Sequence, residues 1–257
     1  MKVRTVDLNC DMGESYGVYH LGRDSDIMPL VSAANIACGF HAGDPLTMQT
    51  SVRMAVQHKV AIGAHPGYPD LVGFGRRSLA ATPEEVYAMV VYQVGAISAV
   101  ASAAGGRVRH VKPHGALYNT ATQSMEIAKA IATAVRDVDD SLILYGLSGS
   151  ALVTAGRTLG LVTASEVFAD RTYQPDGSLT PRRHEHALIR TEDTAVLQVL
   201  QMIEEGTVRA VDGTFVRIQA DTVCIHGDGV HALEFATRLR SALGHRGIAV
   251  RAPEASR

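Results

Sequence analysis

Short apolar segments alternate with longer amphipathic segments along most of the chain. The short segments have the length and the branched side chains of buried strands, and the longer ones repeat apolar residues every three or four positions, as helices do. The predicted strands are residues 3–9, 31–36, 60–64, 108–111, 142–145, 161–167 and 222–225, with 247–250 as an eighth that closes the sheet. Seven or eight strand–helix units predict an α/β fold, a parallel (β/α) barrel in a single domain over residues 1–257. An open doubly wound sheet is the alternative.

The ends of the predicted helices carry local signals. Asp44-Pro45 places an N-cap residue before a first-turn proline, and Thr82-Pro83-Glu84-Glu85 has the pattern of a capping box. The predicted helices are residues 24–31, 45–59, 82–105, 150–159, 191–205 and 230–243, with one more after residue 114. Residues 174–190 have no periodic pattern, and residues 208–218 predict a hairpin that turns at Asp212-Gly213.

Polar residues recur with a period of two along the first predicted strand. Asp7, Asn9 and Asp11 share one face, whereas Leu8 and Cys10 share the other. In a barrel the first face points at the axis, where polar groups gather near the mouth. Asp7 could equally satisfy buried backbone donors.

Chemically active residues also follow several strands directly. Because the carboxyl ends of parallel strands open on one mouth of a barrel, residues distant in the chain become neighbours there. The predicted catalytic residues are Asp11, His41, His65, Lys112, His114, Asp170 and His226. The predicted substrate-binding residues are Asp7, Asn9, Glu14, Asn35, Arg76, Glu166, Arg171 and Asp228. His110 begins a strand and receives no role.

Two chemistries fit such a mouth. Asp11, His41 and His65 could hold a hydrolytic metal, since one carboxylate and two imidazoles leave a position open for water. Without a metal, an Asp or His base could activate water while Lys112 and Arg171 stabilise an oxyanion or a phosphoryl group. The residues favour the second scheme slightly. Of the three cysteines, only Cys224 lies on the same face of its predicted strand as a predicted site residue, His226, so it is the one thiol kept as a candidate.

Composition limits the partners. With 24 basic and 26 acidic residues the formal charge is −2, so the chain has no excess of positive charge that would attract nucleic acid or an anionic membrane. The 3 cysteines lack the spacing of a zinc site, and no signal peptide or membrane-spanning stretch is visible, so we expect a cytoplasmic protein. The chain also lacks a Gly-x-x-x-x-Gly-Lys-Ser/Thr loop and a dinucleotide fingerprint, so its own residues do not indicate an ATP site.

Five long blocks resemble the LamB/YcsF family in order and sequence. They are residues 7–14 (DLNCDMGE), 35–44 (NIACGFHAGD), 63–70 (GAHPGYPD), 111–119 (VKPHGALYN) and 224–228 (CIHGD). The resemblance implies a distorted barrel of the glycoside hydrolase/deacetylase kind. It also implies ATP-dependent hydrolysis of the lactam of 5-oxo-L-proline to L-glutamate, with subunits B and C of a 5-oxoprolinase as partners and with ATP bound at or by them.

Two other functions are compatible with these residues. The first is a metal-dependent deacetylase or amidohydrolase that works without ATP, which the barrel and the Asp-His-His set allow. The second is a non-catalytic subunit that binds the lactam and presents it to its partners. Bound metal would favour the first, and turnover that survives substitution of Asp11 or His41 would favour the second.

Overall fold

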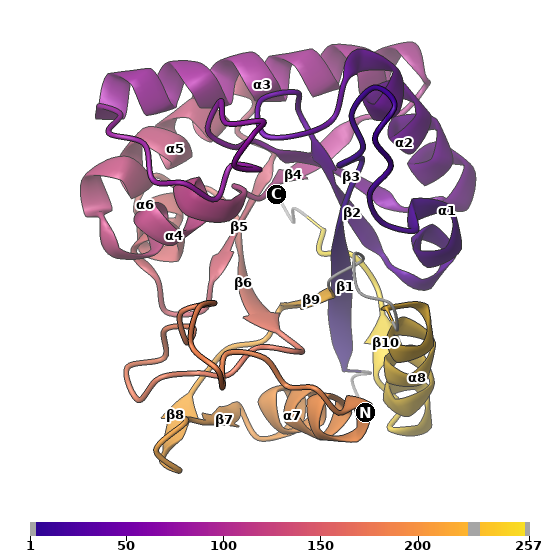
Figure 1. Ribbon diagram of the computed structural model, residues 1–257, viewed down its shortest axis with the longest axis vertical. Helices are drawn as coiled ribbons and strands as arrows, with labels where there is room; N and C mark the ends of the chain where they lie inside the picture. The colour runs from indigo at the N-terminus through magenta and orange to yellow at the C-terminus, as the bar shows by residue number, and fades with distance from the viewer. Residues whose placement is uncertain (1–3, 226–231, 255–257) are drawn as a thin grey trace.

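Seven parallel strands close into a barrel in the computed structural model, which describes residues 4–225 and 232–254 (Figure 1). The barrel strands are β1 (Thr5–Met12), β2 (Ala33–Ala37), β3 (Ala61–His65), β4 (Val108–Val111), β5 (Ile143–Leu147), β6 (Thr163–Phe168) and β9 (Thr222–Ile225). They follow one another in that order, and β9 pairs with β1 through Asp7–Cys10. This last pairing confirms the closed barrel and excludes the open sheet.

The eighth strand of this sheet does not close the barrel. β10 (Ala249–Val250) pairs only with Thr5 and Val6, the first two residues of β1. The reason is length, because β1 has 8 residues and its middle section is already paired with β9. The prediction that residues 247–250 complete the barrel is therefore wrong in this detail.

Helices surround the barrel, as Figure 1 shows. They are α1 (Asp24–Ile27), α2 (Pro45–His58), α3 (Pro83–Ala103), α4 (Gly115–Gln123), α5 (Met125–Val138), α6 (Ala151–Thr158), α7 (Glu192–Glu204) and α8 (Ala232–His245), with the 3-10 turn η1 (Met28–Leu30) after α1. Two helices, not one, follow β4, because Ser124 ends α4 and its hydroxyl accepts from the backbone N–H of Ile127 to cap α5. Strands β7 (Thr207–Arg209) and β8 (Phe215–Arg217) form the predicted hairpin.

The predicted helix starts of α2 and α3 are confirmed. The Asp44 carboxylate accepts from the backbone N–H groups of Leu46 and Thr47, and Thr82 and Glu85 form a complete capping box. By length and composition α3 could cross a membrane. Its apolar stripe is nevertheless buried in the core beside α5, and the core helix of a folded domain passes the same test.

The outward-facing side chains of the barrel strands are apolar, and many of the inward-facing ones are polar. Leu8 and Cys10 of β1 point outward into the packing between strands and helices, as the alternation predicts. The inward residues are polar and still buried: Asp7, Asn9, Asn35, His110, Lys112, Glu166 and Thr222. Burying so many polar groups is tolerable only if they hydrogen-bond to one another, so the lumen must hold a connected network.

Candidate functional site

A cavity of about 1090 Å³ opens where the barrel strands end. Its wall includes six of the predicted site residues from three separate segments and a seventh from the segment after β6: Asp11, Glu14, His65, Arg76, Lys112, His114 and Arg171. The loops that follow β1, β3, β4 and β6 bring these residues together. The structure thus gathers Asp11, His65, Lys112 and His114 around one space, as the strand-end positions predict.

Lys112 is the central cation on the wall of this cavity. Its ammonium lies 2.9 Å from Asp11 Oδ1 and 2.9 Å from Glu166 Oε1, and it also contacts Asn9 Oδ1 at 3.2 Å and Cys224 Sγ at 3.1 Å. Burial alone would discharge the amine, but the surrounding Asp11, Cys224 and Glu166 outweigh it and raise the pKa of Lys112 well above its ordinary value. Lys112 therefore stays charged and holds two carboxylates in place.

Asp11 links this cation to the histidines. Its Oδ1 accepts from Lys112 Nζ and from Asn35 Nδ2 at 2.8 Å, which leaves Oδ2 3.2 Å from His65 Nε2. Burial favours the neutral carboxyl, yet the positive charge beside it, which Lys112 supplies, holds the pKa of Asp11 well below its usual range. The carboxylate is ionised and has one oxygen aimed at the histidines.

The hydrogen bond of His65 fixes its tautomer. His65 Nδ1 lies 2.7 Å from the backbone carbonyl of Lys112, and a carbonyl can only accept. Nδ1 therefore carries a proton, and whenever the ring is neutral Nε2 presents a lone pair to the cavity. A metal-binding histidine is commonly oriented in this way by a backbone carbonyl.

His114 presents a second lone pair to the same point. Its Nε2 donates to the backbone carbonyl of Phe74 at 2.8 Å, so Nδ1 is unprotonated, and this Nδ1 lies only 3.0 Å from His65 Nε2. Burial, with a contribution from His65, lowers the pKa of His114 to about 3, so a proton shared between the rings is disfavoured near neutral pH. Two lone pairs at this distance repel each other unless a cation lies between them.

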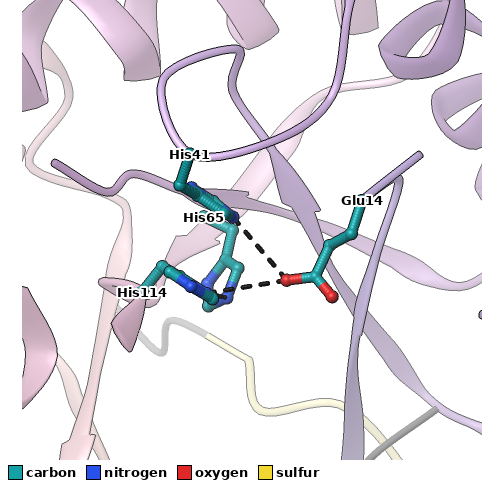
Figure 2. Close-up of side chains that lie close together, drawn as sticks. All are labelled: Glu14, His41, His65 and His114. Atoms are coloured by element: carbon teal, nitrogen blue, oxygen red, sulfur yellow. Dashed lines mark hydrogen bonds and ion pairs between the residues drawn. The ribbon is translucent and has the colours of Figure 1, made fainter. Parts of the chain in front are cut away.

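Glu14 and His41 complete the cluster. Glu14 Oε1 lies 3.6 Å from His41 Nε2 and 3.6 Å from His114 Nδ1, and Figure 2 shows all four side chains converging on one point. Ligand atoms of Glu14, His41, His65 and His114 lie within 4.8 Å of one another. Within the described ranges neither ring nitrogen of the buried His41 makes a hydrogen bond, and burial lowers the pKa of His41 well below its ordinary value.

Glycines hold this cluster together by close approach. Gly75 has φ +61°, and a Cβ there would lie 2.7 Å from His41 Cβ and 2.9 Å from His114 Cδ2. Only glycine allows the loop after β3 to press against both rings, and the same loop supplies the Phe74 carbonyl that orients His114.

Comparison with known proteins agrees with the geometry. The model of the LamB/YcsF family matches residues 6–257. The chain belongs to the LamB/YcsF family. It is 63% identical over 251 residues to a protein of Geobacillus kaustophilus named as the A subunit of 5-oxoprolinase, a match covering 98% of each chain. A protein of Tolumonas auensis with the same name is 60% identical, over 96% of this chain and 98% of its own.

Solved structures support the fold of this LamB/YcsF member. The crystal structure of a lactam utilization protein from Thermus thermophilus has 49% identity and a TM-score of 0.92, and the match covers 97% of this chain and 100% of the other. A protein of Enterococcus faecalis described as a putative cellobiose-phosphate cleavage protein has 14% identity and a TM-score of 0.57, with 97% of each chain covered. The latter likeness concerns the fold alone.

Several predicted substrate-binding residues lie beneath the cavity and do not form its wall. Asp7, Asn9, Asn35 and Glu166 are all completely buried in the barrel interior. Asp7, for example, accepts hydrogen bonds from Ser32, Thr222 and Tyr145. These four residues are buried below the wall of the cavity, and their contact with a substrate stays a prediction.

Two predicted residues after β6 have different positions relative to the cavity. The Arg171 guanidinium donates to the backbone carbonyls of Thr180 and Ala187, so it mainly secures the irregular segment 174–190. Asp170 is partly buried but is not part of the cavity wall. The predicted residues His226 and Asp228 lie outside the described residues.

The cavity contains residues that sequence patterns did not single out. Tyr118 forms part of the wall, and its hydroxyl donates to Glu166 Oε2 at 2.7 Å. Arg182 and Arg183 also reach the wall, although the segment that carries them has no periodic pattern. Tyr118 is within a block that resembles the family, which was the only available signal; nothing marked the two arginines.

The donor set of the Glu14, His41, His65 and His114 cluster fits a divalent transition metal. Imidazole nitrogens and carboxylate oxygens are the ligands of catalytic zinc and of similar ions. The facing lone pairs of His65 and His114 and the unsatisfied His41 nitrogens each favour a cation at the same point. The metal set predicted from sequence named two of these residues, with Asp11 as the carboxylate where the structure groups Glu14 with the histidines.

Proposed function

We propose that this chain is the subunit of an ATP-dependent 5-oxoprolinase that opens the lactam ring of 5-oxo-L-proline to give L-glutamate. The observation that carries the proposal is the convergence of Asp11, Lys112, Glu14, His65 and His114 on the wall of one cavity, in a chain whose relatives are named as the A subunit of 5-oxoprolinase. We propose further that all 257 residues act as one cytoplasmic domain with two partner subunits, B and C.

In this proposal Glu14, His41, His65 and His114 hold a divalent metal. When bound, such a metal polarises a carbonyl oxygen and makes a bound water more acidic. His65 and His114 are held ready as ligands because the backbone carbonyls of Lys112 and Phe74 fix their tautomers.

The remaining wall residues position the reacting groups. Asp11 Oδ2 faces the cluster and accepts a proton from the attacking water. Lys112 keeps that carboxylate in place, and its charge favours negative charge developing nearby. Arg76, on the wall beside His114, is suited to the carboxylate of the substrate because a guanidinium binds carboxylates through paired hydrogen bonds.

ATP coupling fits the chemistry of the substrate. A five-membered lactam is an unstrained amide that closes easily, so its opening needs an activated carbonyl. We assign activation, by transfer of a phosphoryl group from ATP to the lactam oxygen, to the partner subunits. Water then adds to that carbon, the carbon–nitrogen bond breaks with a proton passing to nitrogen, and a second water releases phosphate from the resulting acyl phosphate.

The test is glutamate release from 5-oxo-L-proline by the chain alone and with its partner subunits, each with and without ATP. We expect release only from the complete set with ATP. Asp11→Ala should abolish release while the complex still assembles. Undiminished release by this variant would contradict a catalytic role and support a subunit that only binds the lactam.

One observation favours a second candidate function, a metal-dependent amidohydrolase or deacetylase without ATP. The Glu14, His41, His65 and His114 cluster is of the kind that hydrolytic metals use without nucleotide. Release of glutamate, or of acetate from acetylated sugars, by the chain alone with added Zn²⁺ or Mn²⁺ would support this function. The 5-oxoprolinase proposal predicts no turnover under those conditions.

A further inference from the structure

His110 occupies a slot in the barrel interior that is shaped for its ring. It lies on β4 with 1% of its surface exposed, and its ring stacks on Tyr145 with centroids 4.2 Å apart. On the opposite side is Gly63 of β3, its registered neighbour, where a Cβ would lie only 2.0 Å from His110 Nε2. The backbone of Gly63 does not need a positive φ, so glycine is required there for space.

The hydrogen bond of His110 has only one possible direction. Its Nε2 lies 2.8 Å from Asn35 Oδ1, and Asn35 Nδ2 lies 2.8 Å from Asp11 Oδ1. A carboxylate can only accept, so the amide nitrogen of Asn35 must face Asp11 and the amide oxygen must face His110. The proton of His110 is therefore on Nε2.

A second amide contact reinforces this direction. Asn35 Nδ2 also donates to Asn9 Oδ1 at 2.7 Å, while Asn9 Nδ2 donates to the Glu166 carboxylate at 3.0 Å. Glu166 fixes the amide of Asn9 in the same way that Asp11 fixes that of Asn35. The hydrogen bonds therefore all point the same way: His110 donates to Asn35, and Asn35 donates to Asp11.

The tautomer of His110 leaves a polar atom unsatisfied. Within the described part of the chain, the buried Nδ1 of His110 has no hydrogen-bond partner. A buried acceptor without a partner costs about 1–3 kcal/mol. An apolar residue would avoid that cost, and burial also keeps the ring neutral, since it lowers the pKa of His110 to about 3. What the histidine adds is one neutral donor aimed at Asn35.

We propose that His110 is a positioning residue for Asp11: its Nε2–H fixes the amide of Asn35, which directs the Asp11 carboxylate toward the histidine cluster. With Oδ1 of Asp11 taken by Asn35 and Lys112, only Oδ2 is left to face His65. Without the donor at position 110, Asn35 Oδ1 loses its hydrogen bond to His110, so the amide is held only through its nitrogen and directs the Asp11 carboxylate less firmly. This inference rests on the proposed role of Asp11 in hydrolysis.

The kinetic test uses a matched pair of variants in the complete complex. A glutamine amide nitrogen is as many bonds from the backbone as histidine Nε2, whereas that of asparagine corresponds to Nδ1. We expect His110→Asn and His110→Phe to lower kcat by about 10- to 100-fold with KM changed less than about threefold. His110→Gln should recover most of kcat. Equal losses in all three variants, or a loss confined to KM, would overturn the proposal.

A substitution on the neighbouring strand β3 also displaces the His110 ring. Gly63→Ala keeps His110 but forces its ring away from Asn35, so it should reproduce the kcat loss of His110→Asn. Normal kcat in a folded Gly63→Ala protein would contradict the proposal. Thermal unfolding of each variant identifies any that do not fold. If Gly63→Ala is one of them, the comparison of kcat between His110→Gln and His110→Asn decides the question.

A spectroscopic test separates this inference from the proposed function. Nitrogen-15 NMR of the histidine rings in the chain alone distinguishes the two tautomers without any turnover, and His110→Gln assigns the signal. We expect a neutral ring protonated on Nε2. A ring protonated on Nδ1 would overturn the positioning role even if the complex proves to be an active 5-oxoprolinase. If His110 shows the expected tautomer but the complex has no 5-oxoprolinase activity, only the proposed function is refuted.

Discussion

At the scale of single residues, the site is defined by which nitrogen of each histidine carries its proton. Backbone carbonyls hold a proton on Nδ1 of His65 and on Nε2 of His114, so in the neutral rings the remaining nitrogens present lone pairs to each other at 3.0 Å. Glu14 adds an anionic oxygen beside them. Such a concentration of acceptors is costly in the absence of a cation, and it explains why these residue types occur together.

Substitution of Glu14 tests the cluster directly. Glu14→Gln removes the anionic ligand with little change in volume, so we expect affinity for Zn²⁺ or Mn²⁺ to fall by about tenfold or more. Titration calorimetry of chelator-treated protein measures the change. His58→Gln, at an exposed position on the outer face of α2, is the control and should bind metal as the parent does. Equal metal affinity in Glu14→Gln would show that this carboxylate is not a ligand.

At the scale of elements, the loop after β3 and the caps of the helices set the positions of these side chains. The loop carries the Phe74 carbonyl and presses Gly75 against His41 and His114. The capping box of α3 then ends the loop at a defined residue. The loop is therefore a structural part of the cluster.

Gly75→Ala separates backbone strain from contact with the cluster. Gly75 and Gly149 both have a positive φ, but a Cβ at Gly149 meets nothing within 4 Å. Each alanine variant should lose about 1–2 kcal/mol of stability from the left-handed backbone. Only Gly75→Ala should also weaken metal binding, because its Cβ displaces two of the rings. Metal titration and chemical denaturation of both variants decide this, and equal metal affinities would contradict the expectation.

The α3 cap offers an independent measure of element stability. Thr82→Ala removes the hydroxyl that accepts from the Glu85 N–H, so we expect a loss of about 1 kcal/mol in the free energy of unfolding. Thr191 occupies the same cap position on α7 but makes no side-chain cap bond. Thr191→Ala should therefore cost much less, and denaturant unfolding that shows equal losses would refute the comparison.

At the scale of the whole molecule, the barrel interior links buried charge to pH. The lumen holds Asp7, Lys112 and His110 away from water, so their protonation equilibria differ between the folded and unfolded chains. Burial raises the pKa of Asp7 from 3.8 to about 6 and lowers that of His110 from 6.5 to about 3. These two shifts have opposite consequences for stability.

The pH dependence of unfolding separates the two contributions. The contribution of His110 to the free energy of unfolding is complete above pH 6.5. It is lost as the pH falls toward 3, because the histidine of the unfolded chain takes up a proton at a higher pH than that of the folded chain. For Asp7, the folded chain takes up the proton first, so this residue adds stability as the pH falls from 6 to 3.8.

Two variants isolate these terms. Relative to the parent, His110→Gln should flatten the loss of stability between pH 6.5 and pH 4, and Asp7→Asn should steepen it. Each group contributes up to about 1.4 kcal/mol per pH unit within its window. Guanidinium unfolding of chelator-treated protein at several pH values measures the slopes. Slopes unchanged from the parent would mean that these groups are not buried as described.

Much of the fold was predictable from local patterns. The period of two in β1 correctly directs Asp7, Asn9 and Asp11 inward, and strand-end positions correctly bring Asp11, His65, Lys112 and His114 to one mouth. These predictions succeed because side-chain alternation and parallel pairing follow from backbone geometry alone. The choice of β9 over β10 to close the barrel was not predictable, since it depends on which strand reaches the middle of β1.

The sequence by itself determined which residue types reach the barrel mouth, because strand periodicity and helix caps act over a few neighbouring residues. Only the tertiary structure decided their roles. Glu14 joins three histidines, Asp7 and Asn35 lie buried below the wall of the cavity, and His110 donates to Asn35. Tautomers, amide orientations and depth within the barrel are set by partners 24 to 215 positions away in the chain, and no local pattern records them.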